Sequence, residues 1–137
     1  MAVISELIRV ETDGTISFGD YTLEAKAKLD NFNHNGASYK VKTYKDITKL
    51  ECNDVFVYES VPGTAVSNFN KEESQVSFNA MGLEGAQITL GLEPETDYEI
   101  TVDGESIGIM NTNLGGKLSL SVEIEEEKPV SILINKK

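Results

Sequence analysis

A serine motif in the last third of the chain matches a known catalytic pattern. Gly104-Glu105-Ser106-Ile107-Gly108 has the Gly-x-Ser-x-Gly spacing of a hydrolase nucleophile elbow. That chemistry requires the serine on a sharp strand-to-helix turn, with a histidine base and an acid brought in from elsewhere. Here Gly104 belongs to an Asp-Gly hairpin signal, no helical pattern follows, and His34 is the single histidine of the chain. We therefore predict that Ser106 is a strand residue beside a turn and not a nucleophile.

Two further patterns resemble metal sites, and both are incomplete. Asn31-x-Asn33-x-Asn35-Gly36 imitates the start of a calcium loop, but calcium requires charged oxygen ligands and the closing position is Lys42, whose ammonium group cannot bind a cation. His34 and Cys52 are each solitary, so a zinc cluster or a cysteine–histidine dyad lacks members within one chain. No glycine-rich phosphate loop occurs. The sequence predicts no metal and no cofactor.

Carboxylates are the most abundant reactive side chains. Two of them can hydrolyse a glycosidic bond when suitably spaced, but among 23 acidic residues a chance pair is easy to find. Glu123, Glu125, Glu126 and Glu127 cluster before Lys128-Pro129, a composition typical of a solvated turn. The chain has no tryptophan, and its other aromatic residues mostly alternate as core residues do, so no platform for stacking sugars is indicated. We therefore predict no catalytic residues.

The charge balance restricts the partners. The 23 acidic and 12 basic residues give a net charge of −11, and a field of that sign repels phosphate backbones, anionic membranes and anionic glycans. We expect neither nucleic acid nor a membrane as a partner.

There is no run of about 18 apolar residues and no basic leader before an apolar segment. A single cysteine allows no internal disulfide, which fits a reducing compartment. These features predict a cytoplasmic protein.

The elements that would position these residues alternate with a period of two. Apolar and polar residues alternate over 76–80, 98–102, 118–124 and 130–134, which indicates strands with one buried and one solvated face. Tight-turn signals separate the strand-like runs, and they are Asp13-Gly14, Asn35-Gly36, Asn53-Asp54 and Asp103-Gly104. Hairpins that follow one another along the chain predict an all-β fold, an antiparallel meander or β-sandwich.

The first half raises one question of element type and one of domain boundary. Residues 21–29 alternate cleanly, which favours a strand, although Leu, Glu, Ala and Lys also favour helices. We interpret the segment as a strand because the alternation is unbroken and ends at a hairpin signal.

A break in the chain is marked by Val61-Pro62-Gly63 and the polar run 68–74. We predict an N-terminal antiparallel β-unit over residues 1–70 and a C-terminal β-sandwich over residues 71–137, two small units packed together.

One segment of the second half resembles a known sandwich family. Leu92-x-Pro94-x-Thr96-x-Tyr98-x-Ile100-x-Val102 resembles the segment that enters a late strand of fibronectin type III domains. In that family the tyrosine hydroxyl binds back to the backbone at a loop corner. More strand-like runs follow than such a domain has left to place. The resemblance therefore implies a fibronectin type III-like sandwich of related shape and not that domain itself.

Most of the chain also resembles small bacterial proteins of clostridial type that are called endosialidase or endosialidase-like. The resembling stretches are VISELIRVETDGTISFGDYTL (residues 3–23), VFVYESVPGTAV (residues 55–66) and TNLGGKLSLSVE (residues 112–123). That resemblance implies cleavage of polysialic acid. Sialidases hold the sialate carboxylate with several arginines, whose guanidinium groups match its geometry. Arg9, the single arginine here, is the candidate binding residue, and a symmetric trimer would gather three copies of it.

The incomplete catalytic patterns favour a function without catalysis. We predict a β-sandwich scaffold or self-assembling interaction module, because the edge strands of small sheets invite pairing with a second copy or another protein. The alternative is a carbohydrate-active protein, either a glycan-binding module or an endosialidase-like glycosidase. A third interpretation is an accessory subunit whose partner supplies the chemistry.

Overall fold

The computed structural model describes residues 3–126 and 128–137 and consists of β-strands and their connections. The strands are β1 (Ile8–Val10), β2 (Ile16–Phe18), β3 (Ala27–His34), β4 (Ala37–Tyr44), β5 (Ile47–Cys52), β6 (Val55–Val61), β7 (Ala65–Lys71), β8 (Gln75–Met81), β9 (Ala86–Gly91), β10 (Asp97–Val102), β11 (Glu105–Asn111), β12 (Lys117–Val122) and β13 (Val130–Lys136). Among the described residues, no helix has the length and apolar character needed to cross a membrane.

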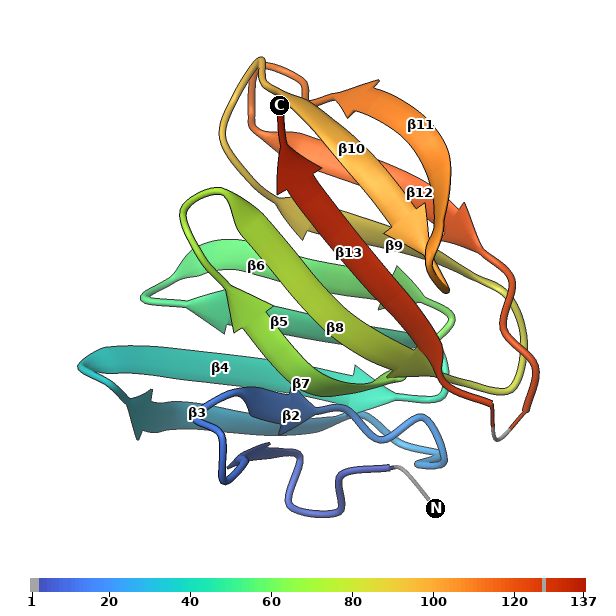
Figure 1. Ribbon diagram of the computed structural model, residues 1–137. Helices are drawn as coiled ribbons and strands as arrows, with labels where there is room; N and C mark the ends of the chain where they lie inside the picture. Colours follow the sequence, from blue (N-terminus) through green and yellow to red (C-terminus); the bar gives the residue numbers. More distant parts are fainter. Residues whose placement is uncertain (1–2, 127) are drawn as a thin grey trace.

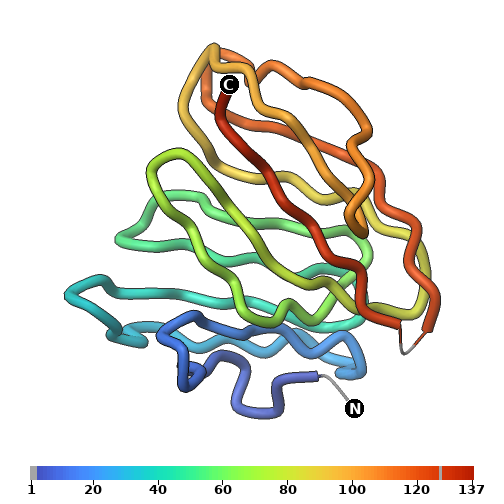
Figure 2. Tube along the Cα trace, viewed as in Figure 1, coloured from blue at the N-terminus to red at the C-terminus, as the bar shows by residue number. Residues whose placement is uncertain are grey.

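The strands form two antiparallel sheets that pack together, as Figure 1 shows. The seven-stranded sheet has the order β1-β2-β7-β8-β13-β10-β11, and the six-stranded sheet has the order β12-β9-β6-β5-β4-β3. The chain passes several times from one sheet to the other, which can be followed along the trace in Figure 2. The predicted all-β class with antiparallel strands is confirmed.

The predicted turn signals lie between paired strands. Asn35 and Gly36 have φ angles of 51° and 78° between β3 and β4, and Asp103 and Gly104 have 51° and 83° between β10 and β11. Two successive positive φ angles are the signature of the type I′ turn, whose twist matches that of the flanking strands. The sequence therefore indicated these hairpins through residues that tolerate the left-handed conformation.

The strand predicted over residues 21–29 is wrong in its bounds, because β3 begins only at Ala27. The backbone N–H and the hydroxyl of Thr22 both donate hydrogen bonds to the Asp20 carboxylate, and this local pairing turns the chain. The asparagine-rich segment 31–36, which imitates the start of a calcium loop, is mostly strand, with only Asn35-Gly36 in the turn.

The boundary predicted at residue 70 does not separate the two layers. Residues 1–70 and 71–137 both contribute strands to each sheet, since β7 pairs with β8 in one and β6 pairs with β9 in the other. The buried apolar side chains form one cluster that extends from Ile8 to Ile134. The two ranges therefore share both sheets and one core.

Four aromatic rings of this core form one contacting group. The Tyr58 ring, from the six-stranded sheet, meets the Phe18 and Phe78 rings of the seven-stranded sheet at centroid distances of 5.3 and 5.6 Å, both edge to face. Phe69 lies 5.7 Å from Phe18 and 5.5 Å from Phe78. Edge-to-face pairs are stabilising beyond the area that they bury. Tyr58 thus joins the two layers at the centre of the sandwich.

A network of buried hydroxyl groups lies where the chain crosses from β6 to β7. The Thr48 hydroxyl donates to the Thr64 carbonyl at 2.7 Å and accepts from the Thr64 N–H at 3.1 Å. Thr43 Oγ1 lies 2.8 Å from Thr48 Oγ1 and accepts the Asp20 N–H. The hydroxyls of Tyr58 and Ser60 each lie 2.8 Å from Thr64 Oγ1. The alternation predicts that polar residues face outward, so these inward hydroxyls are an exception that the network explains.

We expect Thr48→Val to destabilise the protein through this network. The substitution keeps the volume but leaves the Thr64 backbone groups and the Thr43 hydroxyl without their partner. Each buried polar group left unsatisfied costs about 1–3 kcal/mol, so a loss of about 2–4 kcal/mol is expected in urea unfolding. Thr89→Val is the matched control, because the Thr89 hydroxyl bonds to Ser119 on the exposed surface. Equal losses in the two variants would contradict this role of Thr48.

The pH dependence of stability tests the burial of Tyr58. Burial raises the pKa of Tyr58 to about 12, although hydrogen bonds with Thr64 and Ser60 lower it in part. An unfolded tyrosine titrates at about 10, so this contribution to stability is complete below pH 10 and is lost as the pH rises through 12. Tyr58→Phe should be less stable than the wild type at neutral pH. We expect the difference between their urea midpoints to shrink above pH 10, and a constant difference would contradict the assignment.

Candidate functional site

The sandwich is open at one end. The outer strand of the seven-stranded sheet there is β11, and all its residues from Glu105 to Asn111 are exposed. The outer strand of the six-stranded sheet at the same end is β12, as Figure 1 shows. Both strands have a neighbour on one side only, so their outer edges carry backbone groups without a strand partner.

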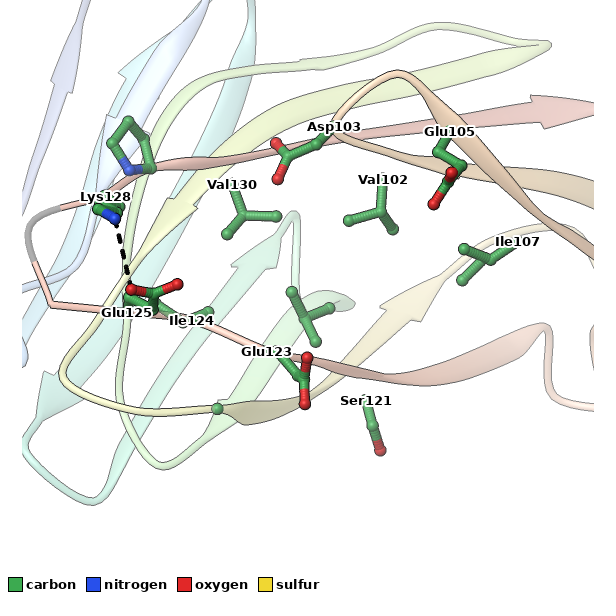
Figure 3. A pocket seen from close by; sticks show the side chains of 13 residues that line it. Val102, Asp103, Glu105, Ile107, Ser121, Glu123, Ile124, Glu125, Lys128 and Val130 are labelled. Carbon is green, nitrogen blue, oxygen red and sulfur yellow. Dashed lines mark hydrogen bonds and ion pairs between the residues drawn. The ribbon is translucent and has the colours of Figure 1, made fainter.

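A cleft of about 1000 Å³ lies at this open end, between the β10–β11 hairpin and the chain that follows β12. Its apolar part consists of Val102, Ile107, Val122, Ile124 and Val130. Figure 3 shows Val102, Val130 and Ile107 in the space between the two walls. The apolar surface combines side chains of the β10–β11 hairpin with side chains of the chain around the end of β12 and the start of β13.

Carboxylates surround the apolar part of the cleft. Asp103 accepts the Ser131 N–H at 2.8 Å, which ties the β10–β11 turn to β13, and Glu125 lies 3.4 Å from the Lys128 ammonium. The carboxylates of Glu105 and Glu123 line the same cleft, and their side chains form no hydrogen bond or ion pair within residues 3–126 and 128–137. No group of three or more ligating side chains in that part of the chain could hold a metal ion. Glu127, the remaining member of the predicted acidic cluster, lies outside the described residues.

Exposed apolar side chains extend from the cleft onto β11. Ile107, Ile109 and Met110 are exposed by 54%, 60% and 36%, and Leu114 in the following loop is exposed by 82%. We call these four residues the β11 patch. A register shift next to Gly108, whose φ is 116°, places an extra residue in β11 opposite β10. The patch went unrecognised in the sequence, although apolar residues at adjacent positions 109 and 110 break the alternation and signal a strand that is apolar on both sides.

Ser106 lies in β11, beside the turn, as predicted. Its hydroxyl donates a hydrogen bond to Glu99 Oε2 at 2.9 Å. This hydrogen bond and the Lys137 ammonium lower the pKa of Glu99 below its ordinary value. His34 lies on β3, the outer strand at the opposite end of the six-stranded sheet, so the structure does not bring the serine and the histidine together.

The solitary His34 and Cys52 line one smaller cavity, of about 320 Å³, together with Tyr39. Tyr39 is directly opposite Cys52 in the β4–β5 ladder, and burial and the neighbouring thiol raise the pKa of Tyr39. The His34 ring nitrogen Nε2 lies 3.0 Å from the Gly14 carbonyl, to which it can donate. The sequence did not indicate this grouping, because the three residues meet only through strand pairing.

Arg9, the predicted binding residue, lies in β1 with its side chain 45% exposed. Its Nε donates to Glu11 Oε2 at 3.0 Å, and its Nη1 lies 3.8 Å from Glu6. Glu11 also accepts a hydrogen bond from Ser17, which together with Arg9 lowers the pKa of Glu11. A carboxylated sugar at Arg9 would compete with two carboxylates of the protein itself.

The Tyr98 hydroxyl accepts a hydrogen bond from the Glu93 N–H at 3.2 Å. This contact has the form of a tyrosine hydroxyl that binds back to the backbone at a loop corner. It holds the segment between β9 and β10 and lies away from the residues of the cleft. No protein-family model, curated protein or solved structure matches the chain. The resemblances to fibronectin type III domains and to endosialidase-like proteins therefore stay predictions.

The assignment of Ser106 as a hydrogen-bond donor to Glu99 has a direct test. We expect Ser106→Ala to raise the pKa of Glu99, because the hydroxyl stabilises the charged carboxylate. The pKa of Glu99 can be measured by NMR titration of its side-chain carboxyl carbon. Ser119→Ala, on β12, is the control and should leave the pKa of Glu99 unchanged. An unchanged value in Ser106→Ala would contradict the assignment.

Proposed function

We propose that this protein is a non-catalytic β-sandwich module that assembles with a second copy of itself through β11. The observation that carries the proposal is the β11 patch on an outer strand with an unpaired edge. Exposed apolar side chains on an edge strand favour pairing with another strand, which satisfies the backbone groups and removes apolar surface from water. We also propose a cytoplasmic location, with which the single cysteine is compatible.

The geometry favours a twofold arrangement. Two copies of β11 that pair antiparallel would join two seven-stranded sheets into one continuous sheet, with the same residues on both sides of the axis. Ile107 and Ile109 would then lie near their counterparts. The opposite end of the sandwich is less suited to such pairing, because β1 has only three residues and β3 carries the charged side chains of Lys28 and Asp30, whereas residues 106–111 of β11 carry no charge.

Electrostatics oppose this association and give it a recognisable signature. Each copy carries a net charge of −11, and Asp103, Glu105 and Glu123 lie beside the proposed interface. Salt screens repulsion between exposed charges over a Debye length of about 8 Å at physiological ionic strength. The proposed dimer should therefore become more stable as salt is added, whereas an assembly held by opposite charges would weaken.

Size-exclusion chromatography with light scattering tests the proposal. We expect a dimer whose population rises with protein and salt concentration, and a monomer for Ile109→Lys, because a charge on an edge strand blocks pairing. Val55→Lys is the matched control, since Val55 is 64% exposed at the start of β6, which pairs with β5 and β9 in the other sheet. It should dimerise as the wild type does. A wild-type monomer at all concentrations, or a dimeric Ile109→Lys, would exclude assembly through β11.

A further inference from the structure

Four lysines gather on the outer face of the six-stranded sheet, away from the β11 patch. Lys28 on β3, Lys40 and Lys42 on β4, and Lys49 on β5 line a depression of about 180 Å³ together with Glu51. They are four of the 12 basic residues in a protein whose net charge is −11. Positive charge is thus concentrated on a small part of an otherwise acidic molecule. We call these four residues the lysine cluster.

The strand register places three of these lysines in one row. Lys28 is directly opposite Lys42, and Lys42 is directly opposite Lys49. Residues that face each other across antiparallel strands have Cβ atoms about 5 Å apart, and like charges at such positions are destabilising. The neighbouring residues Val41 and Leu50 are buried, so the alternation turns the lysines to the outer face.

Carboxylates of the protein neutralise only part of this charge. Glu51, opposite Lys40, lies 3.8 Å from the Lys40 ammonium and 3.6 Å from the Lys49 ammonium. Lys28 and Lys42 have no ion pair with any carboxylate in the part of the chain that the structure describes. Lys42 is half-buried and lies at the centre of the row. The cluster therefore carries an excess of positive charge that the carboxylates of the described residues do not neutralise.

We infer that the lysine cluster binds a compact oxyanion with more than one negative charge, a phosphate or sulfate group. Each ammonium group supplies three hydrogen-bond donors and a point charge, and several converging lysines suit the oxygens of such a group. The size of the depression fits a small group and not an extended polymer. A bound anion would also relieve the repulsion within the row. Binding should therefore raise the stability of the folded protein.

Calorimetry and thermal unfolding with pyrophosphate as the probe test this inference. We expect saturable binding of pyrophosphate at constant ionic strength, with a rise in Tm that sodium chloride of equal ionic strength does not produce. Lys42→Gln should weaken binding about tenfold, the loss expected for one charge-assisted hydrogen bond. Lys71→Gln, on the other sheet, is the matched control and should bind as the wild type does.

A second readout separates binding from folding. Without anion, Lys42→Gln should have a Tm equal to or above that of the wild type, since it removes a repelling charge.

Separate titrations with a sugar phosphate and with sulfate identify the source of the group. Tighter binding of the sugar phosphate assigns a phosphate ester, and tighter binding of pyrophosphate or sulfate assigns the free anion. Unchanged pyrophosphate binding in Lys42→Gln would overturn the inference. Absence of binding to the wild type, or binding of an oligonucleotide without binding of any small anion, would also overturn it.

Discussion

The hydrogen bonds between Thr48 and Thr64 are the contact on which the two-layer arrangement depends. The chain leaves β6 in one sheet and enters β7 in the other within a few residues, and backbone groups at such a crossing lose their ladder partners in a buried place. The Thr48 hydroxyl pairs with both the N–H and the C=O of Thr64, as a neighbouring strand would. Gly19 allows the close approach, because a Cβ there would lie 2.4 Å from the Thr64 carbonyl oxygen. The polar crossing and the aromatic core share Tyr58, so packing and hydrogen bonding are satisfied together.

This crossing sets the two sheets against each other, and the outer strands at the two ends of the sandwich differ in length and in side chains. At the β1 and β3 end, β1 has only three residues, and charged side chains such as Arg9 and Lys28 lie on the outer strands. At the other end, the outer strand β11 has seven residues and exposes apolar side chains. Natural edge strands are often protected by charges or short length. The asymmetry between the ends is the physical basis for placing association at β11.

Net charge and local charge lead to different expectations for partners. A net charge of −11 predicts repulsion of anions at long range, and for this reason the sequence predicts no anionic partner. Strand pairing nevertheless places Lys28, Lys42 and Lys49 in one row, with Glu51 as the neighbouring carboxylate. At short range the row dominates, because interactions between exposed charges are largely screened beyond a Debye length of about 8 Å. A long polyanion would still meet the negative field of the rest of the molecule.

The sequence by itself determined the all-β class, the antiparallel pairing and the tight hairpins, because alternation and positive-φ residues such as Asn35-Gly36 and Asp103-Gly104 act over a few neighbouring positions. It also placed Ser106 in a strand beside a turn. Only the tertiary structure decided what depends on contacts between distant segments: the mixing of strands from residues 1–70 and 71–137, the inward hydroxyls of Thr43 and Thr48, and the shared cavity of His34 and Cys52. The cleft and the lysine cluster belong to the same group. Which strand becomes an edge, and which side chains share a row, follows from register and sheet order, and neither is encoded in the local pattern of one strand.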